Sequence, residues 1–218
     1  MQYILGEWSF MGFDFKVGRG VLIPRDDTEV VVNLCIDFLE NRTDRKTVDL
    51  CSGSGAIAVA LDKISGAEVT AVEIYETAFS YLEINVKENN SSVKPVMADA
   101  LEICDTFADG GLDLIVSNPP YIKSADIETL QKEVRLEPRL ALDGGEDGCD
   151  FYREIVSRWS RKLKKGGALA FELGENQADT VKALMTDKGF SDLKFHLTLA
   201  VCRGRLLELC SDFRNFVR

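Results

Sequence analysis

Short apolar segments alternate with segments of helical periodicity along most of the chain, and this alternation limits the folds available to it. The strand-like segments cover residues 47–50, 68–73, 93–97, 112–117 and 168–173. Segments with apolar residues at helical spacing separate most of them. We predict an α/β fold with a mostly parallel sheet covered by helices on both faces. Two later runs, near 191–200 and 204–210, predict a closing antiparallel hairpin.

Length and boundary signals predict one large domain with a short leading segment. Residues 1–25 alternate like a β-hairpin or linker, and 26–218 form the main domain of the 218-residue chain. Asp26 or Asp27 is the expected N-cap of a helix near 29–39. A helix over 150–164 is expected to end at Lys164-Lys165-Gly166-Gly167, because helix C-termini prefer cations and glycine.

Composition excludes several classes of function. The formal net charge is −10, which argues against a broad nucleic-acid surface. No stretch approaches the ~20 apolar residues of a membrane span, and no signal peptide leads the chain, so we expect a cytoplasmic protein with reduced cysteines. The single histidine, His196, lies in a late strand-like run, and the cysteines lack metal-ligand spacing. We therefore expect no metal site and no histidine-dependent nucleophile.

A tight glycine loop follows the first of the main strand-like runs. It reads Cys51-Ser52-Gly53-Ser54-Gly55 and leads directly into a helix. Its glycines permit positive φ and close approach of a ligand to the backbone. The loop lacks the third glycine of the dinucleotide fingerprint and the lysine of a phosphate loop. A nucleoside without phosphate is thus a better candidate ligand than NAD or ATP, and an ordinary turn is the alternative.

Acidic residues end the next two strand-like runs. Glu73 lies about 20 residues past the glycine loop, where an acid binds ribose hydroxyls in βαβ nucleotide sites. Asp99 ends the following run, where it either reaches an adenine amino group or caps the turn at Leu101.

The run 112–117 ends in Asn118-Pro119-Pro120-Tyr121. The carboxyl edge of a parallel sheet is where ligands bind. The Asn118 side-chain oxygen and the Pro119 carbonyl are suited to accept two hydrogen bonds from one NH2 group, and Tyr121 to stack on the plane that carries it. A strand ending in a proline turn is the plainer interpretation.

A long irregular excursion over 122–149 follows, and we expect it to be functional, as a lid over the substrate. Arg25, which precedes a helix after Pro24, is a further candidate substrate contact.

Together, the glycine loop, the strand-end acid and the Asn-Pro-Pro-Tyr segment resemble Rossmann-like class I S-adenosylmethionine-dependent methyltransferases that methylate a planar NH2. The flanking segments, 10–15 with 22–25, and 137–148, resemble the peptide chain release factor N5-glutamine methyltransferase family. The likeness runs from about Gln2 to Leu209. Family members carry an N-terminal helical domain, and the likeness begins at the segment that follows it.

The resemblance implies transfer of a methyl group from S-adenosylmethionine to the glutamine amide of a release factor Gly-Gly-Gln loop. Residues 51–55 would hold the amino-acid part of the cofactor, Glu73 the ribose, and Asp99 with Ala100 the adenine. Asn118 would also contact the cofactor, Asn118 to Tyr121 would bind the substrate amide, and Asn118, Pro119 and Tyr121 would be the catalytic residues. We expect a monomer that binds neither membrane nor nucleic acid.

Departures from the family pattern leave alternatives open. Cys51 stands where a glycine is usual, which implies a tighter constraint on the loop, and Glu73 is one methylene longer than the common Asp. Arg25 is followed by Asp26 instead of Pro. The alternatives are an N6-adenine or other exocyclic-amine nucleic-acid methyltransferase, and a non-catalytic module that binds the cofactor or a release factor.

Overall fold

The computed structural model describes residues 2–131, 134–197 and 206–211. Within them, seven strands form one sheet in the order β5-β4-β3-β6-β7-β9-β8. Its strands, in chain order, are β3 (Lys46–Leu50), β4 (Glu68–Glu73), β5 (Lys94–Met97), β6 (Leu112–Ser117), β7 (Leu163–Glu172), β8 (Leu193–Leu197) and β9 (Leu206–Ser211). The pairs from β5 through β7 are parallel, and β9 is antiparallel to both of its neighbours. The predicted seven-stranded α/β sheet with an antiparallel C-terminal strand is confirmed.

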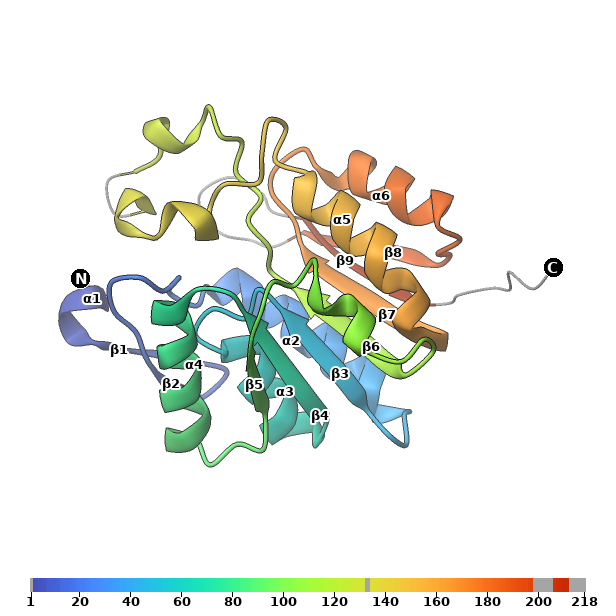
Figure 1. The fold of residues 1–218 in the computed structure, drawn as a ribbon, viewed down its shortest axis with the longest axis horizontal. Helices are drawn as coiled ribbons and strands as arrows, with labels where there is room; N and C mark the ends of the chain where they lie inside the picture. The colour runs from blue at the N-terminus through green and yellow to red at the C-terminus, as the bar shows by residue number, and fades with distance from the viewer. Residues whose placement is uncertain (1, 132–133, 198–205, 212–218) are drawn as a thin grey trace.

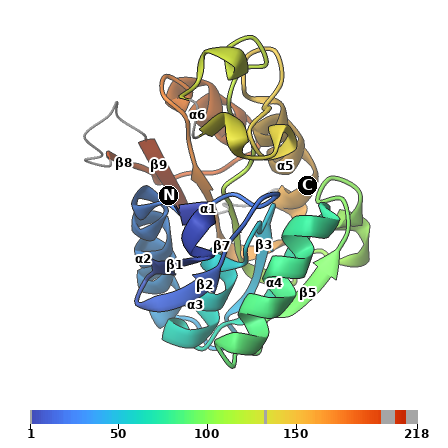
Figure 2. The same cartoon turned by 90° about the vertical axis from the view of Figure 1, so that its left-hand side faces the viewer.

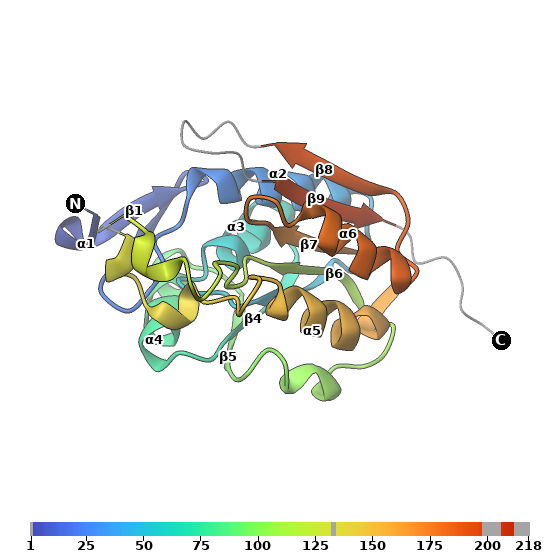
Figure 3. The same ribbon diagram turned by 90° about the horizontal axis from the view of Figure 1, so that it is seen from above.

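Helices cover both faces of this sheet, as Figure 3 shows for α2 and α5 on opposite sides of β6 and β7. The main helices are α2 (Asp26–Glu40), α3 (Ala56–Ser65), α4 (Glu76–Glu88), α5 (Asp150–Trp159) and α6 (Ala178–Asp187).

Side chains that alternate along the strands build a core on each face. Leu114 and Val116 of β6 pack with residues of α2 and α3, whereas Ile115 packs with α5. Because strand side chains alternate between faces, one apolar run supplies both cores.

The N-terminal segment packs against α4. It contains a short helix, α1 (Gln2–Leu5), and an antiparallel hairpin of β1 (Glu7–Phe10) and β2 (Phe13–Lys16), visible beside α4 in Figure 2. The buried amide of Asn85 on α4 accepts a hydrogen bond from the Lys16 backbone N–H at 2.6 Å and donates to the Lys16 carbonyl at 3.1 Å. The hairpin expected before residue 25 is present, while the domain boundary there stays a prediction.

Two expected boundaries are wrong. Helix α5 ends at Trp159, and Lys164 to Gly167 belong to β7 rather than to a helix end. Lys164 is drawn into the sheet because its ammonium donates to the buried Asp113 of β6 at 2.8 Å, a pairing that no local pattern reveals. At the start of α2, Arg25 occupies the N-cap, and Asp26 and Asp27 lie in the first turn, where acids favour the helix dipole.

Three further expectations concern the cysteines, membrane-spanning helices and the turn between β8 and β9. Among the described residues, Cys35, Cys51, Cys104 and Cys149 are free thiols. No helix in the described part of the chain has the length and apolarity needed to cross a bilayer. The predicted hairpin pairing of β8 with β9 is confirmed, while the turn at Cys202 to Gly204 lies outside the described residues.

Candidate active site

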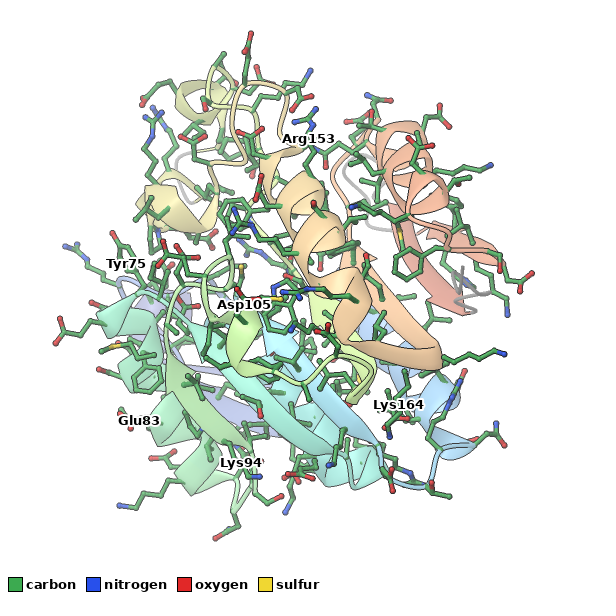
Figure 4. The ribbon with its side chains drawn as sticks, turned by 45° about the vertical axis from the view of Figure 1, so that its right-hand side comes forward. Tyr75, Glu83, Lys94, Asp105, Arg153 and Lys164 are labelled. Carbon is green, nitrogen blue, oxygen red and sulfur yellow. The ribbon has the colours of Figure 1, made fainter. Side chains whose placement is uncertain are left out.

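A cavity opens at the carboxyl ends of the parallel strands, beneath the excursion drawn in yellow-green in Figure 1. Figure 4 shows Tyr75, which lines this cavity, near the end of β4 that faces the excursion, whereas Lys94 lies at the opposite end of the sheet. From β3 the chain proceeds to β4 and β5 on one side, and later to β6 and β7 on the other. Ligands of open α/β sheets bind where the strand order reverses in this way.

The glycine loop forms the floor of the cavity. Cys51, Ser52, Gly53 and Ser54 line it, and Gly55 lies just outside the lining. Gly53 has φ +55, and a Cβ there would meet nothing within 4 Å, so its open side is free for a ligand. Gly55 has φ +82, and a Cβ there would come 2.4 Å from the Leu82 side chain. The second glycine is therefore required by close packing of the loop on α4.

Cys51 also adopts a left-handed conformation, with φ 59. This conformation is uncommon for residues with a side chain. Burial raises the pKa of its thiol, with a smaller contribution from the nearby Glu73 carboxylate. Cys51 is thus a neutral lining group held in a glycine-like backbone conformation.

Glu73 ties β4 to the glycine loop. Its Oε2 accepts the Gly53 N–H and its Oε1 accepts the Tyr75 N–H, both at 2.8 Å. Burial raises the pKa of this carboxyl group, and the backbone donors partly offset that effect. A carboxylate has about four lone-pair sites, so acceptor capacity remains beyond what the backbone donors use, and Glu73 lines the cavity.

Asp99 and Ala100 lie at the end of β5 and line the same cavity. One carboxylate oxygen of Asp99 accepts the Leu101 N–H at 2.7 Å, which is the turn-capping geometry expected as one of its two alternatives. Apolar side chains complete the wall around it: Ile74, Ala78, Ala98 and Leu101. A flat apolar ring with a polar edge would fit between them.

Asp49 lies in the sheet just before the loop, fully buried between Ala71 of β4 and Val116 of β6. Neither carboxylate oxygen has a hydrogen-bond partner among the described residues. Burial raises the pKa of Asp49 to about 8. The side chain is therefore largely neutral at pH 7.

Asn118 follows β6 and Glu73 ends β4, so these two lining residues come from the strands on either side of β3. Its Nδ2 donates to Oε2 of Glu172 at 3.0 Å. Pro120 also lines the cavity, whereas Pro119 and Tyr121 are outside the lining. The Tyr121 hydroxyl donates to Oε1 of Glu172 at 3.3 Å. The stacking role expected for Tyr121 stays a prediction.

The excursion covers the side of the cavity next to Arg25. Pro138, Leu140 and Ala141 line it from the excursion, and Arg25 lines it from the start of α2. An ion pair of 2.5 Å joins Arg25 to the buried Glu137. Backbone hydrogen bonds join the two ends of the excursion. The Ile122 N–H donates to the Leu142 carbonyl and the Gly144 N–H donates to the Ile122 carbonyl, each at 2.8 Å.

Sequence reasoning missed Thr28 and Glu172. Thr28 lines the cavity from the first turn of α2, and Glu172 lies behind Asn118 at the end of β7. A signal for Glu172 existed, because it is the only acid in the apolar strand run 168–173.

Comparison with known proteins identifies the family. The Methyltransferase small domain family matches residues 25–139. Release factor glutamine methyltransferase of Clostridium acetobutylicum is 39% identical over 198 residues, which cover 89% of this chain and 69% of that protein. Its counterpart in Geobacter sulfurreducens is 45% identical, covering 88% of this chain and 66% of the relative. The chain belongs to the release factor glutamine methyltransferase family. It spans 55% to 69% of the length of three such relatives, the shortest share being that of the Fusobacterium nucleatum protein.

Solved structures extend the likeness of this family member to more distant methyltransferases. A methyltransferase from Pyrococcus furiosus superposes with a TM-score of 0.69 at 22% identity, covering 92% of this chain and 89% of the other. The human Mettl16 catalytic domain, solved with a 3′UTR hairpin, gives 0.76 at 15% identity, covering 94% and 76%. At such identities the likeness supports the methyltransferase fold alone.

Proposed function

We propose that this protein transfers a methyl group from S-adenosylmethionine to the side-chain amide nitrogen of a glutamine in a peptide chain release factor. The observation that carries the proposal is that Asn118, Glu73 and the glycine loop line one cavity. The relatives of this chain are named for that reaction.

The residues present fit S-adenosylmethionine. The open side of Gly53 and the polar atoms of Ser52 and Ser54 suit the charged amino-acid end of the cofactor. The remaining acceptor sites of Glu73 suit two ribose hydroxyls. The apolar wall near Ala100, with Asp99 at its edge, suits adenine. When bound, this cofactor supplies an electrophilic methyl group.

Asn118 and Pro119 would hold the substrate amide. An amide nitrogen is a poor nucleophile because its lone pair is delocalised into the carbonyl. The Asn118 Oδ1 and the Pro119 carbonyl would accept its two N–H groups and direct the lone pair toward the methyl group. The nitrogen would gain the methyl group as the bond between that methyl and the sulfonium sulfur breaks, which leaves a neutral thioether, and it would give up one N–H proton to water. Positioning and electrostatic stabilisation would accelerate the methyl transfer, and no titrating base of this chain would be required.

Pro120, Tyr121 and Arg25 would shape the substrate side. Pro120 and Arg25 border the cavity, and Tyr121 packs against the core on the α5 face of the sheet. Arg25, paired with Glu137, keeps the excursion over that side.

The test is mass spectrometry of a bacterial release factor after incubation with this protein and S-adenosylmethionine. We expect one methyl group on the glutamine of its Gly-Gly-Gln loop. The Asn118→Ala variant should lower kcat by about 100-fold, because it removes an acceptor aligned with the reacting nitrogen. Its affinity for the cofactor, measured by calorimetry, should change little.

Asn33→Ala is the matched control, since Asn33 is exposed on α2. It should keep full turnover. An unmethylated release factor together with methylated adenine in DNA or RNA would replace the proposal with the nucleic-acid alternative. Cofactor binding without turnover on either substrate would favour a binding module.

A further inference from the structure

Glu172 lies directly beside Asn118 because of the register of two parallel strands. β6 and β7 pair Val116 with Ala170 and Ser117 with Phe171. The residues that follow this last pair are Asn118 after β6 and Glu172 at the end of β7. Their side chains point to the face that carries α2, since Val116 and Ala170 belong to the core on that face. The Glu172 carboxylate is fully buried there.

Three side-chain donors converge on this carboxylate. The Thr28 hydroxyl of α2 donates to Oε2 at 2.5 Å, and Asn118 Nδ2 donates to the same oxygen at 3.0 Å. The Tyr121 hydroxyl donates to Oε1 at 3.3 Å. Burying a carboxylate is costly unless donors compensate it. An apolar residue would fill a purely structural site at lower cost, so the presence of an acid here points to a task at Asn118.

The carboxylate fixes which end of the Asn118 amide faces the cavity. An asparagine side chain has donors on nitrogen and lone pairs on oxygen, and a half-turn of the amide exchanges them. With Oδ1 against the carboxylate, two acceptors would face each other. With Nδ2 there, a hydrogen bond forms and Oδ1 turns away. Within the described residues no hydrogen bond is made to Asn118 Oδ1, which leaves this oxygen available for a substrate N–H.

We propose that Glu172 is a positioning residue for methyl transfer, which holds the Asn118 amide with its oxygen toward the substrate nitrogen while Thr28 holds the carboxylate. This inference rests on the proposed function. Glu172 is not among the residues that line the cavity, so it would touch neither substrate nor cofactor and would act through Asn118.

The experiment compares Glu172→Met with Glu172→Gln. Methionine removes the acceptor, so the Asn118 amide loses its fixed orientation. We expect a kcat about 100-fold lower, as for other small misplacements of a reacting geometry. Glutamine retains one acceptor oxygen for Thr28 and Asn118, and its NH2 group can donate to Tyr121. Its kcat should be at least about tenfold higher than that of the methionine variant. KM for the release factor and calorimetric affinity for S-adenosylmethionine should stay near wild type in both.

A double mutant separates action through Asn118 from any other action. In the Asn118→Ala background, Glu172→Met should change kcat by less than about twofold, since the group it orients is absent. If the methionine substitution lowered kcat equally in both backgrounds, or if glutamine failed to restore turnover, the positioning role would be wrong. Full turnover in Glu172→Met would also overturn it.

Thr28→Val provides a second route should the methionine variant fail to fold. It removes the hydroxyl donor at nearly constant volume, and we expect a kcat about tenfold lower that Thr28→Ser restores. Unchanged turnover in Thr28→Val would count against the inference. The exposed Asn33→Ala on the same helix is the matched control. A wild-type protein that methylates no release factor would refute the proposed function itself, whereas an active wild type with normal variants would refute only the role of Glu172.

Discussion

At the scale of single residues, the carboxylate of Glu73 would perform two tasks with one group. It closes the glycine loop through Gly53 and would also bind the cofactor ribose. We expect Glu73→Gln to weaken S-adenosylmethionine binding by about 10- to 100-fold, because hydrogen bonds to a charged group contribute about 1.5–3 kcal/mol. The glutamine NH2 would also face a backbone N–H of Gly53 or Tyr75, donor against donor.

Isothermal calorimetry measures this effect. Glu83→Gln is the control, since Glu83 is exposed on α4 (Figure 4). Equal affinities in wild type and Glu73→Gln would remove Glu73 from the cofactor site.

Asp49 should make stability depend on pH. Its pKa is about 8 in the folded protein, above the ordinary value of 3.8. Between these values the folded state binds a proton that the unfolded state releases, so the free energy of unfolding falls as pH rises from about 4 to 8 and then levels off. Asp49→Asn carries no titrating group and should lack this decline. It therefore gains stability relative to wild type as pH rises through this range.

Urea unfolding at intervals from pH 5 to 9 tests this expectation, with the exposed Asp37→Asn as control. Parallel pH profiles for wild type and Asp49→Asn would show that Asp49 is ionised in the folded protein.

At the scale of elements, the glycines of residues 143–148 let the end of the excursion pack closely against the backbone of the Asn118–Tyr121 segment. A Cβ on Gly144 would come 2.7 Å from the Tyr121 Cα and 2.8 Å from the Pro120 carbonyl oxygen. Both are backbone atoms that cannot rotate away.

Gly144→Ala should therefore lower the free energy of unfolding by about 1–3 kcal/mol and displace the Asn118 segment. We expect kcat for release factor methylation to fall as well. Gly111→Ala is the control, because its nearest contact is 3.1 Å and it lies at the far end of β6. A variant with normal stability and turnover would mean that the excursion shifts freely against this segment.

The sequence predicted elements well where the signal is local. Apolar runs located the strands, and the ends of β4 and β6 placed Glu73 and Asn118 at the cavity. The boundary between α5 and β7 was wrong because Lys164 is positioned by Asp113, 51 residues away. Glu172 and Thr28 were missed for the same reason, since their hydrogen bond joins positions 144 residues apart. Contacts of this range depend on sheet register, which a local pattern does not specify.

At the scale of the whole molecule, the formal net charge of −10 argues against a broad surface for nucleic acid. Phosphate binding depends on Lys and Arg, and excess acid repels the backbone. We expect no change in fluorescence anisotropy of a labelled RNA hairpin or DNA duplex at protein concentrations up to about 10 μM, where basic proteins bind non-specifically.

A basic RNA-binding protein titrated against the same probes serves as the positive control. Salt-dependent binding by this protein would reveal a local basic surface and return attention to an exocyclic amine as substrate.

The closed base of the excursion, where Ile122 lies beside Asp143, has an evolutionary consequence. The backbone bonds there hold both ends of the intervening segment at fixed points of the sheet edge. Because the entropic cost of closing a loop grows slowly with its length, insertions or replacements within the segment should leave β6 and α5 in their positions. The part of the excursion that borders the cavity can thus change in length and sequence while the strand ends beneath it keep their positions.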